Sequence, residues 1–140
     1  MVIVSPIFHS TGLATFLVGA ALGNKIVTAR RFDPEVALKL IADHKADMLV
    51  AVPTMLHRMV ELAPGVIAKY DVSTLKVILI SGSALTPELS SRVQDTFGDV
   101  LYNIYASTEC GFATVATPDE LRRAPGTAER AMENPRQDQC

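Results

Sequence analysis

The sequence has 140 residues, of which 49% are hydrophobic and 20% are charged, and its formal net charge is −2. Such a chain can bury the core of one domain, and its charge offers neither a basic face for nucleic acid nor a polybasic signal for a membrane surface. The two cysteines, Cys110 and Cys140, are far apart. They form neither a disulfide framework nor a zinc spacing, so a reducing cytosol is the default expectation.

The N-terminal part is apolar, and its first charged residue is Lys25. A signal peptide needs a basic start before its apolar stretch, and none is present. The apolar run at residues 13–22 is too short to span a membrane and is interpreted as a buried helix. The expected location is cytoplasmic, with peripheral association with a membrane as a further option.

Strands alternate with helices along the first hundred residues. Short aliphatic or β-branched runs predict strands at residues 2–5, 25–28, 48–52, 76–80 and 100–104. Helices are predicted at residues 12–23, 34–44, 54–62 and 87–97. The connections are too long for hairpins, so we expect right-handed crossovers and an α/β fold with a mostly parallel βαβ sheet and helices on both faces.

Two helices have clear start signals, because Asp33 and Thr86 are good N-caps and each precedes a proline. The inward side chains expected on the helix at 34–44 are Val36, Ala37, Leu40, Ile41 and His44. Those expected on the helix at 54–62 are Met55, Leu56, Met59 and Val60. The run at 75–80 is almost all aliphatic, which is typical of a strand buried on both faces.

The pattern stops near Thr117, and after one possible helical turn at 118–123 almost nothing apolar follows Gly126. Such a segment cannot offset the entropy cost of ordering, so residues 127–140 are expected to be a divergent, disordered tail.

The stretch at residues 100–114 begins as a strand and then changes character. Tyr105, Ala106, Ser107, Thr108 and Glu109 place a ring, two hydroxyls and a carboxylate in five residues. An aromatic ring can stack on a base, hydroxyls can donate to phosphate, and a carboxylate can hold Mg²⁺ shared with phosphates. The alternative is a surface turn in which Ser and Thr act as local caps.

Three other strand ends carry unusual loops, at residues 8–12, 52–54 and 81–84. Parallel strands bring their carboxyl ends to one edge of a sheet, where ligands bind in the crevice between crossovers. We therefore expect one crevice with an apolar side, an aromatic side that stacks on a base, and a side for Mg²⁺ and phosphate.

Several other sites are disfavoured. Ser83 stands in I-S-G-S-A rather than G-x-S-x-G, and all three histidines precede it, so a hydrolase triad does not fit. Neither a G-x-G-x-x-G nor a Walker-type G-x-x-x-x-G-K motif occurs. His44 and His57 lie on different predicted helices without metal-ligand spacing.

Four segments occur in an order and spacing that resemble the adenylate-forming enzymes, specifically the acyl-CoA synthetases (fatty-acid–CoA ligases) of the bacterial kind. The segments are N-I-Y-A-S-T-E at 103–109, S-G-S-A-L at 81–85, P-I-F-H-S-T-G at 6–12 and V-P-T at 52–54. They are similar to the family's N-x-Y-G-x-T-E, G-S-A, P-x-F-H-x-x-G and V-P-T motifs. The resemblance covers residues 2–126, which would be part of the large N-terminal adenylation domain.

The resemblance implies an acid–thiol ligase that converts a carboxylic acid, ATP and CoA into an acyl-CoA through an acyl-adenylate, with Mg²⁺ as the cofactor. The implied nucleotide-binding residues are Gly82, Ser83, Ala84, Asn103, Tyr105, Ala106, Ser107 and Thr108. The implied acyl-substrate residues are Phe8, His9, Val52, Pro53 and Thr54. Thr108, Glu109 and His9 would be catalytic, and Glu109 would hold the metal.

Departures from the family pattern lead to two hypotheses. Ala106 replaces a glycine, Glu129 and Arg130 stand where the family continues differently, and the phosphate loop, ribose-binding aspartate and catalytic lysine have no counterpart. The first hypothesis is an internal fragment of an acyl-CoA synthetase, inactive as this chain alone. The second is a non-catalytic α/β module that binds a nucleotide, an acyl ligand or a protein partner.

Overall fold

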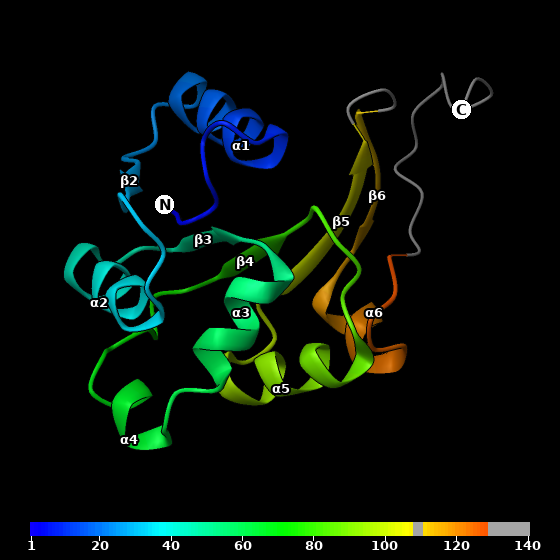
Figure 1. Ribbon diagram of the computed structural model, residues 1–140. Helices are drawn as coiled ribbons and strands as arrows, with labels where there is room; N and C mark the ends of the chain where they lie inside the picture. Colours follow the sequence, from blue (N-terminus) through cyan, green and yellow to red (C-terminus); the bar gives the residue numbers. More distant parts are fainter. Residues whose placement is uncertain (108–110, 129–140) are drawn as a thin grey trace.

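The computed structural model describes residues 1–107 and 111–128, and within them it shows one six-stranded sheet with the order β2-β1-β3-β4-β5-β6 (Figure 1). The strands are β1 (Val2–Ile3), β2 (Val27–Thr28), β3 (Met48–Ala51), β4 (Val77–Ile80), β5 (Leu101–Ser107) and β6 (Gly111–Ala116). The helices are α1 (Ser10–Ala21), α2 (Pro34–His44), α3 (Pro53–Val60), α4 (Pro64–Ile67), α5 (Pro87–Phe97) and α6 (Pro118–Arg123).

The first five strands are parallel, as predicted, but the sixth was not predicted. β6 pairs with β5 in the antiparallel sense, from Asn103 opposite Ala116 to Ser107 opposite Gly111. The register shifts between Tyr105 and Ala106. The run at 111–116 is short and half of it is glycine and alanine, which have low β-propensity, so only its pairing with β5 distinguishes it from a loop.

The crossovers place the helices in two layers. The chain moves one way along the sheet from β1 to β2 and the other way from β2 to β3, so right-handed connections put α1 and α2 on opposite faces. The next crossovers continue in the second direction, which places α3 and α5 on the same face as α2. Figure 1 shows α1 on one side of the sheet and these three helices on the other.

The predicted N-caps are confirmed. An oxygen of Asp33 accepts hydrogen bonds from the backbone N–H groups of Glu35 and Val36, both at 3.0 Å, and Thr86 Oγ1 accepts one from Leu89 at 3.3 Å. α3 begins one residue earlier than predicted, at Pro53, because proline is well suited to the first helical position.

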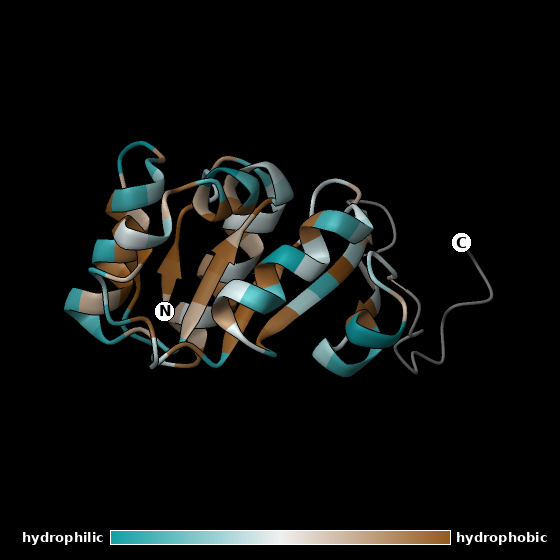
Figure 2. Ribbon diagram, turned by 90° about the horizontal axis from the view of Figure 1, so that it is seen from below, coloured by the Kyte–Doolittle hydropathy of each residue, from teal (hydrophilic) through white to brown (hydrophobic). Residues whose placement is uncertain are grey.

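The main core lies between the sheet and the layer formed by α2, α3 and α5, and Figure 2 shows the strands as its most apolar part. Its largest fully buried side chains include Leu38, Ile41, Leu49, Leu56, Met59, Ile78, Ile80 and Leu101. The expectation that the fourth strand is buried on both faces was wrong: Ile78 and Ile80 are buried, whereas Val77 and Leu79 are only half-buried. The reason is that the face opposite α5 carries no described helix except α1.

The prediction of a buried helix at residues 13–22 was also wrong. α1 buries only its small residues Gly12, Thr15 and Gly19, and it packs through them. Leu13, Leu17 and Val18 on its other sides are exposed, and Leu22, which follows the helix, is 74% exposed. A helix that is apolar all round can bury every side only if it has neighbours on every side. In the part of the chain that the structure describes, no helix is long and apolar enough to cross a bilayer.

The set of α2 side chains that face the core is shifted slightly around the helix axis from the predicted set. Ala37, Leu38 and Ile41 are buried, Leu40 is half-buried, and both Val36 and His44 are exposed. The predicted face of α3 is confirmed, with three of the four side chains buried and Met55 half-buried. Most of the predicted tail, residues 129–140, lies outside the described residues.

Candidate nucleotide-binding site

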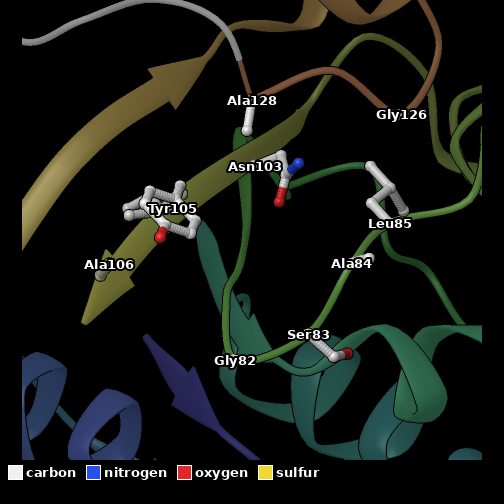
Figure 3. A pocket seen from close by; sticks show the side chains of 10 residues that line it. Gly82, Ser83, Ala84, Leu85, Asn103, Tyr105, Ala106, Gly126 and Ala128 are labelled. Atoms are coloured by element: carbon white, nitrogen blue, oxygen red, sulfur yellow. The ribbon is translucent and has the colours of Figure 1, made fainter. Parts of the chain in front are cut away.

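A pocket of about 370 Å³ opens at the carboxyl ends of β4 and β5 (Figure 3). It is lined by Gly82, Ser83, Ala84, Leu85, Asn103, Ile104, Tyr105, Ala106, Gly126 and Ala128. Its volume lies in the range of about 300–1,000 Å³ that is usual for small-molecule sites. The carboxyl edge of a parallel sheet is also where the strand arrangement predicts a ligand.

One wall is the loop from β4 to α5. Gly82 has φ +96°, a conformation that favours glycine, and it turns the chain out of the buried strand. A Cβ on Gly82 would lie 3.7 Å from Val52 Cγ1, so the loop runs directly over the end of β3. Ser83 and Ala84 follow and are exposed along the wall, while Leu85 is buried and anchors the loop to the core.

The facing wall is β5, whose alternation points Asn103 and Tyr105 to the same side. The Tyr105 ring is 59% exposed, and Figure 3 shows it across the pocket from Ala84 and Leu85. Asn103 is buried, and its Nδ2 donates a hydrogen bond of 2.9 Å to the backbone oxygen of Thr127. Tyr105 therefore offers an open aromatic face, while Asn103 holds the backbone at Thr127 in place.

Residues 126–128, which follow α6, come back to the pocket and form its rim. This part of the pocket was not predicted. Gly126 has φ +86°, and a Cβ there would lie 2.8 Å from the backbone oxygen of Leu85 and 3.1 Å from Pro87 N. Only a residue without a side chain permits this approach. The Pro125-Gly126 pair is a turn signal in the sequence, but its contact with a loop forty residues earlier requires the fold.

We expect Gly126→Ala to destabilise the fold by about 2–4 kcal/mol, because it combines an unfavourable φ with a collision against backbone. Gly98→Ala is the matched control: Gly98 has the same φ of +86°, but a Cβ added there would have no other atom within 4 Å. Gly98→Ala should lower the free energy of unfolding by only about 1–2 kcal/mol. Urea unfolding of both variants measures the difference. An equal decrease in the free energy of unfolding would show that Gly126 does not approach the backbone of Leu85 closely.

Ala106 fits the position at which the related motif has glycine. Among the described residues other than glycine, Lys45 alone has a positive φ, so the backbone at Ala106 accepts a Cβ. Ala106 lines the pocket next to Tyr105, at the register shift of β5. Ser107 ends β5, whereas Thr108 and Glu109 lie outside the described residues. The site of phosphate and metal binding implied by the resemblance therefore remains a proposal.

The loop before α1 lies beside this pocket without lining it. The backbone N–H of His9 donates a 3.1 Å hydrogen bond to Pro6, and Thr11 Oγ1 would lie 3.9 Å from a Cβ on Gly82. Phe8 is 85% exposed, and its ring centroid is 4.8 Å from that of His9, which is also exposed. This pair therefore projects from the carboxyl edge of the sheet.

The other segment assigned to the acyl substrate turns from β3 into α3. Val52 is half-buried beneath the Gly82 loop, Pro53 is buried and Thr54 is exposed. Val52 and Thr11 thus both lie close to Gly82, at 3.7 and 3.9 Å from a Cβ placed there. None of the five residues assigned to the acyl substrate lines the pocket that contains Tyr105.

Within the described residues, Tyr70, Asp71 and Arg122 have shifted pKa values, each because of hydrogen bonds at the surface. The hydrogen bond to Glu35 raises the pKa of Tyr70, and the hydrogen bonds from the Ser73 hydroxyl and backbone lower the pKa of Asp71. Asp95 and Asp99 together raise the pKa of Arg122. These contacts fasten the ends of helices and strands, and they do not involve the pocket lining.

The sequence pattern of the family described as AMP-binding enzyme matches residues 1–136. The chain belongs to this family. The chain is 34% identical over 128 residues to the peroxisomal OPC-8:0-CoA ligase 1 of Arabidopsis thaliana, covering 88% of the chain and 23% of that protein. It is 32% identical over 122 residues to the 4-coumarate–CoA ligase-like protein 8 of the same plant, covering 84% of the chain and 22% of that protein.

Solved structures agree with this assignment. The N-terminal domain of FACL13 from Mycobacterium tuberculosis is 26% identical, with a TM-score of 0.78 over 93% of this chain and 33% of that one. The amide bond synthetase McbA from Marinactinospora thermotolerans, 24% identical, has the same fold, with a TM-score of 0.80 over 87% of this chain and 24% of that one. The resemblance to adenylate-forming CoA ligases is thus confirmed, and the chain spans under a quarter of the ligases it matches in sequence.

Proposed function

We propose that this chain contributes the adenine-binding wall of an AMP-forming acyl-CoA synthetase. The observation that carries the proposal is the exposed Tyr105 ring facing the Gly82–Ser83–Ala84 loop across a pocket of about 370 Å³. An aromatic ring opposite a wall of small residues accommodates a flat base, and base stacking on such a ring contributes about 1–3 kcal/mol. Membership of the AMP-binding family supports this ligand over other flat molecules.

The proposed reaction has two steps. A carboxylate oxygen of the acid bonds to the α-phosphorus of ATP while the bond to pyrophosphate breaks, which gives an acyl-adenylate. The sulfur of CoA then attacks the acyl carbonyl, and AMP leaves. The names of the plant relatives, a 4-coumarate–CoA ligase-like protein and an OPC-8:0-CoA ligase, support a carboxylic acid as the substrate class, and we propose a fatty acid within it.

The proposed residues follow the motifs. Ser107 and Thr108 would contact phosphate, and Glu109 would hold Mg²⁺, which neutralises phosphate charge when bound. His9 would lie beside the acyl carboxylate, with Phe8 and residues 52–54 along the acyl chain. The described residues contain no group of three or more possible metal ligands. The proposal needs none, because Mg²⁺ commonly uses one or two carboxylates together with substrate phosphates and water.

We also propose residues 1–126 as a partial adenylation domain and residues 127–140 as a divergent tail, with cytoplasmic location and optional peripheral contact with a membrane. That the chain alone is inactive is part of this proposal. The matched length, 22–23% of two related ligases, supports it.

Replacement of Tyr105 tests the adenine site. We expect Tyr105→Leu to weaken AMP binding to this chain by about 10- to 100-fold, because a stacking surface is lost. Tyr105→Phe should bind AMP within about threefold of the unaltered chain, because the ring is retained. Isothermal titration or NMR line shifts with AMP measure both constants. Equal binding by the Leu and Phe variants would exclude Tyr105 as the base platform.

A further inference from the structure

A second hollow, of about 380 Å³, lies at the carboxyl ends of β1 and β2, next to α3. Its apolar lining includes Ile3, Phe8, Phe32 and Met55. It shares no residue with the pocket that contains Tyr105. The volume is large enough for a small organic ligand, and the lining offers apolar contact along its length.

Two arginines, Arg30 and Arg31, also line this hollow. Both are exposed, and within the described part of the chain neither forms an ion pair or a side-chain hydrogen bond. The next acidic residue, Asp33, is engaged, because it accepts the backbone N–H groups that cap α2. Two neighbouring guanidinium groups without partners beside an apolar hollow form a site with an excess of positive charge.

Phe32, which lines the hollow, also contacts a cation. The guanidinium of Arg58 lies 5.1 Å from the centre of the Phe32 ring, at the distance of a cation–π contact. The ring is thereby oriented as a fixed wall of the hollow. A third cation is thus also near, which adds to the positive potential felt by a ligand that enters.

One residue that lines the hollow carries a buried hydroxyl without a partner. Ser5 is one of the lining residues and is only 4% exposed, and its hydroxyl has no hydrogen-bond partner within the part of the chain that the structure describes. Buried polar groups are normally paired, and one without a partner next to a cavity marks a place where a ligand or water can bind. Ser5 and Thr28 thus add two hydroxyl-bearing residues to the lining of the hollow.

We propose that this hollow binds an organic anion with an apolar body, whose carboxylate or phosphate head pairs with Arg30 and Arg31. Guanidinium groups hold both kinds of head through paired, charge-assisted hydrogen bonds. The apolar body lies against Phe8, Phe32 and Met55. The site does not depend on the proposed adenine pocket. Because Phe8 is also a proposed acyl-substrate residue, an occupant of the hollow would contact that region.

The experiment uses the whole chain and four probes: decanoate, decyl phosphate, decanol and acetate, each below its aggregation limit. We expect decanoate or decyl phosphate to bind at least about tenfold more tightly than decanol, which lacks the charge, and acetate, which lacks the apolar body. The stronger of the two anions identifies the preferred head. AMP should not displace the anion, which separates this site from the proposed adenine pocket.

The double variant Arg30→Gln with Arg31→Gln should lose at least about tenfold in affinity for that anion. Arg123→Gln is the matched control, because Arg123 is an exposed arginine on α6, and Figure 1 shows α6 at the opposite end of the sheet from β2. It should bind as the unaltered chain does, and thermal unfolding should confirm that all variants fold. Unchanged binding in the double variant, equal binding of decanol, or no binding of either anion would overturn the proposal.

Discussion

Glu109→Gln is expected to lower acyl-adenylate formation by about a hundredfold or more in a longer ligase that contains this segment. The amide is close in shape to the carboxylate but carries no negative charge, and Mg²⁺ prefers anionic oxygen ligands. The proposed reaction depends on neutralising charge at phosphorus, because the protein supplies no covalent nucleophile. Acid-dependent exchange of pyrophosphate into ATP measures the adenylation step directly.

A control variant and an assay of the 140-residue chain alone complete this experiment. Glu61→Gln is the matched control, because Glu61 follows α3 at the surface and pairs with His57, and exchange should stay close to the unaltered rate. The 140-residue chain alone should release no AMP with Mg²⁺-ATP, CoA and fatty acids, because most of the length of its relatives is missing from it. AMP release that depends on the acid and disappears in Glu109→Gln would overturn the proposal of an inactive segment, and normal exchange in the mutant ligase would refute the metal assignment.

Gly12→Ala is expected to reduce the free energy of unfolding by about 3 kcal/mol. A Cβ on Gly12 would lie 2.3 Å from the backbone oxygen of Pro6 and 2.8 Å from its carbonyl carbon. Neither atom can turn away as a flexible side chain can, so the loop between β1 and α1 has to move. That movement would also displace His9, whose backbone N–H bonds to the same oxygen of Pro6. Denaturant unfolding of the whole chain gives the change.

Gly65→Ala is the control for this prediction. Gly65 lies in α4 and has nothing within 4 Å of a Cβ, so alanine there should be neutral or stabilising by up to about 1 kcal/mol. If both variants unfold at the same denaturant concentration, the close approach of Gly12 to Pro6 is not part of the folded state.

The local features of this protein could be predicted from its amino-acid sequence. Short aliphatic runs predicted the five parallel strands, and Asp33-Pro34 and Thr86-Pro87 predicted where two helices begin. These features depend on neighbouring residues, through side-chain alternation, fixed proline φ and capping hydrogen bonds. The order and spacing of the motifs also identified the family, and the family match over residues 1–136 confirms that identification.

Only the tertiary structure decided the features that join distant parts of the chain. β6 exists as a strand through its pairing with β5, and the rim of the pocket exists because Gly126 approaches Leu85. The exposure of α1 also could not be predicted from the sequence, because an apolar helix becomes buried only where other elements cover it. Contacts of this kind depend on how whole elements are placed relative to one another, and local propensity carries no information about that placement.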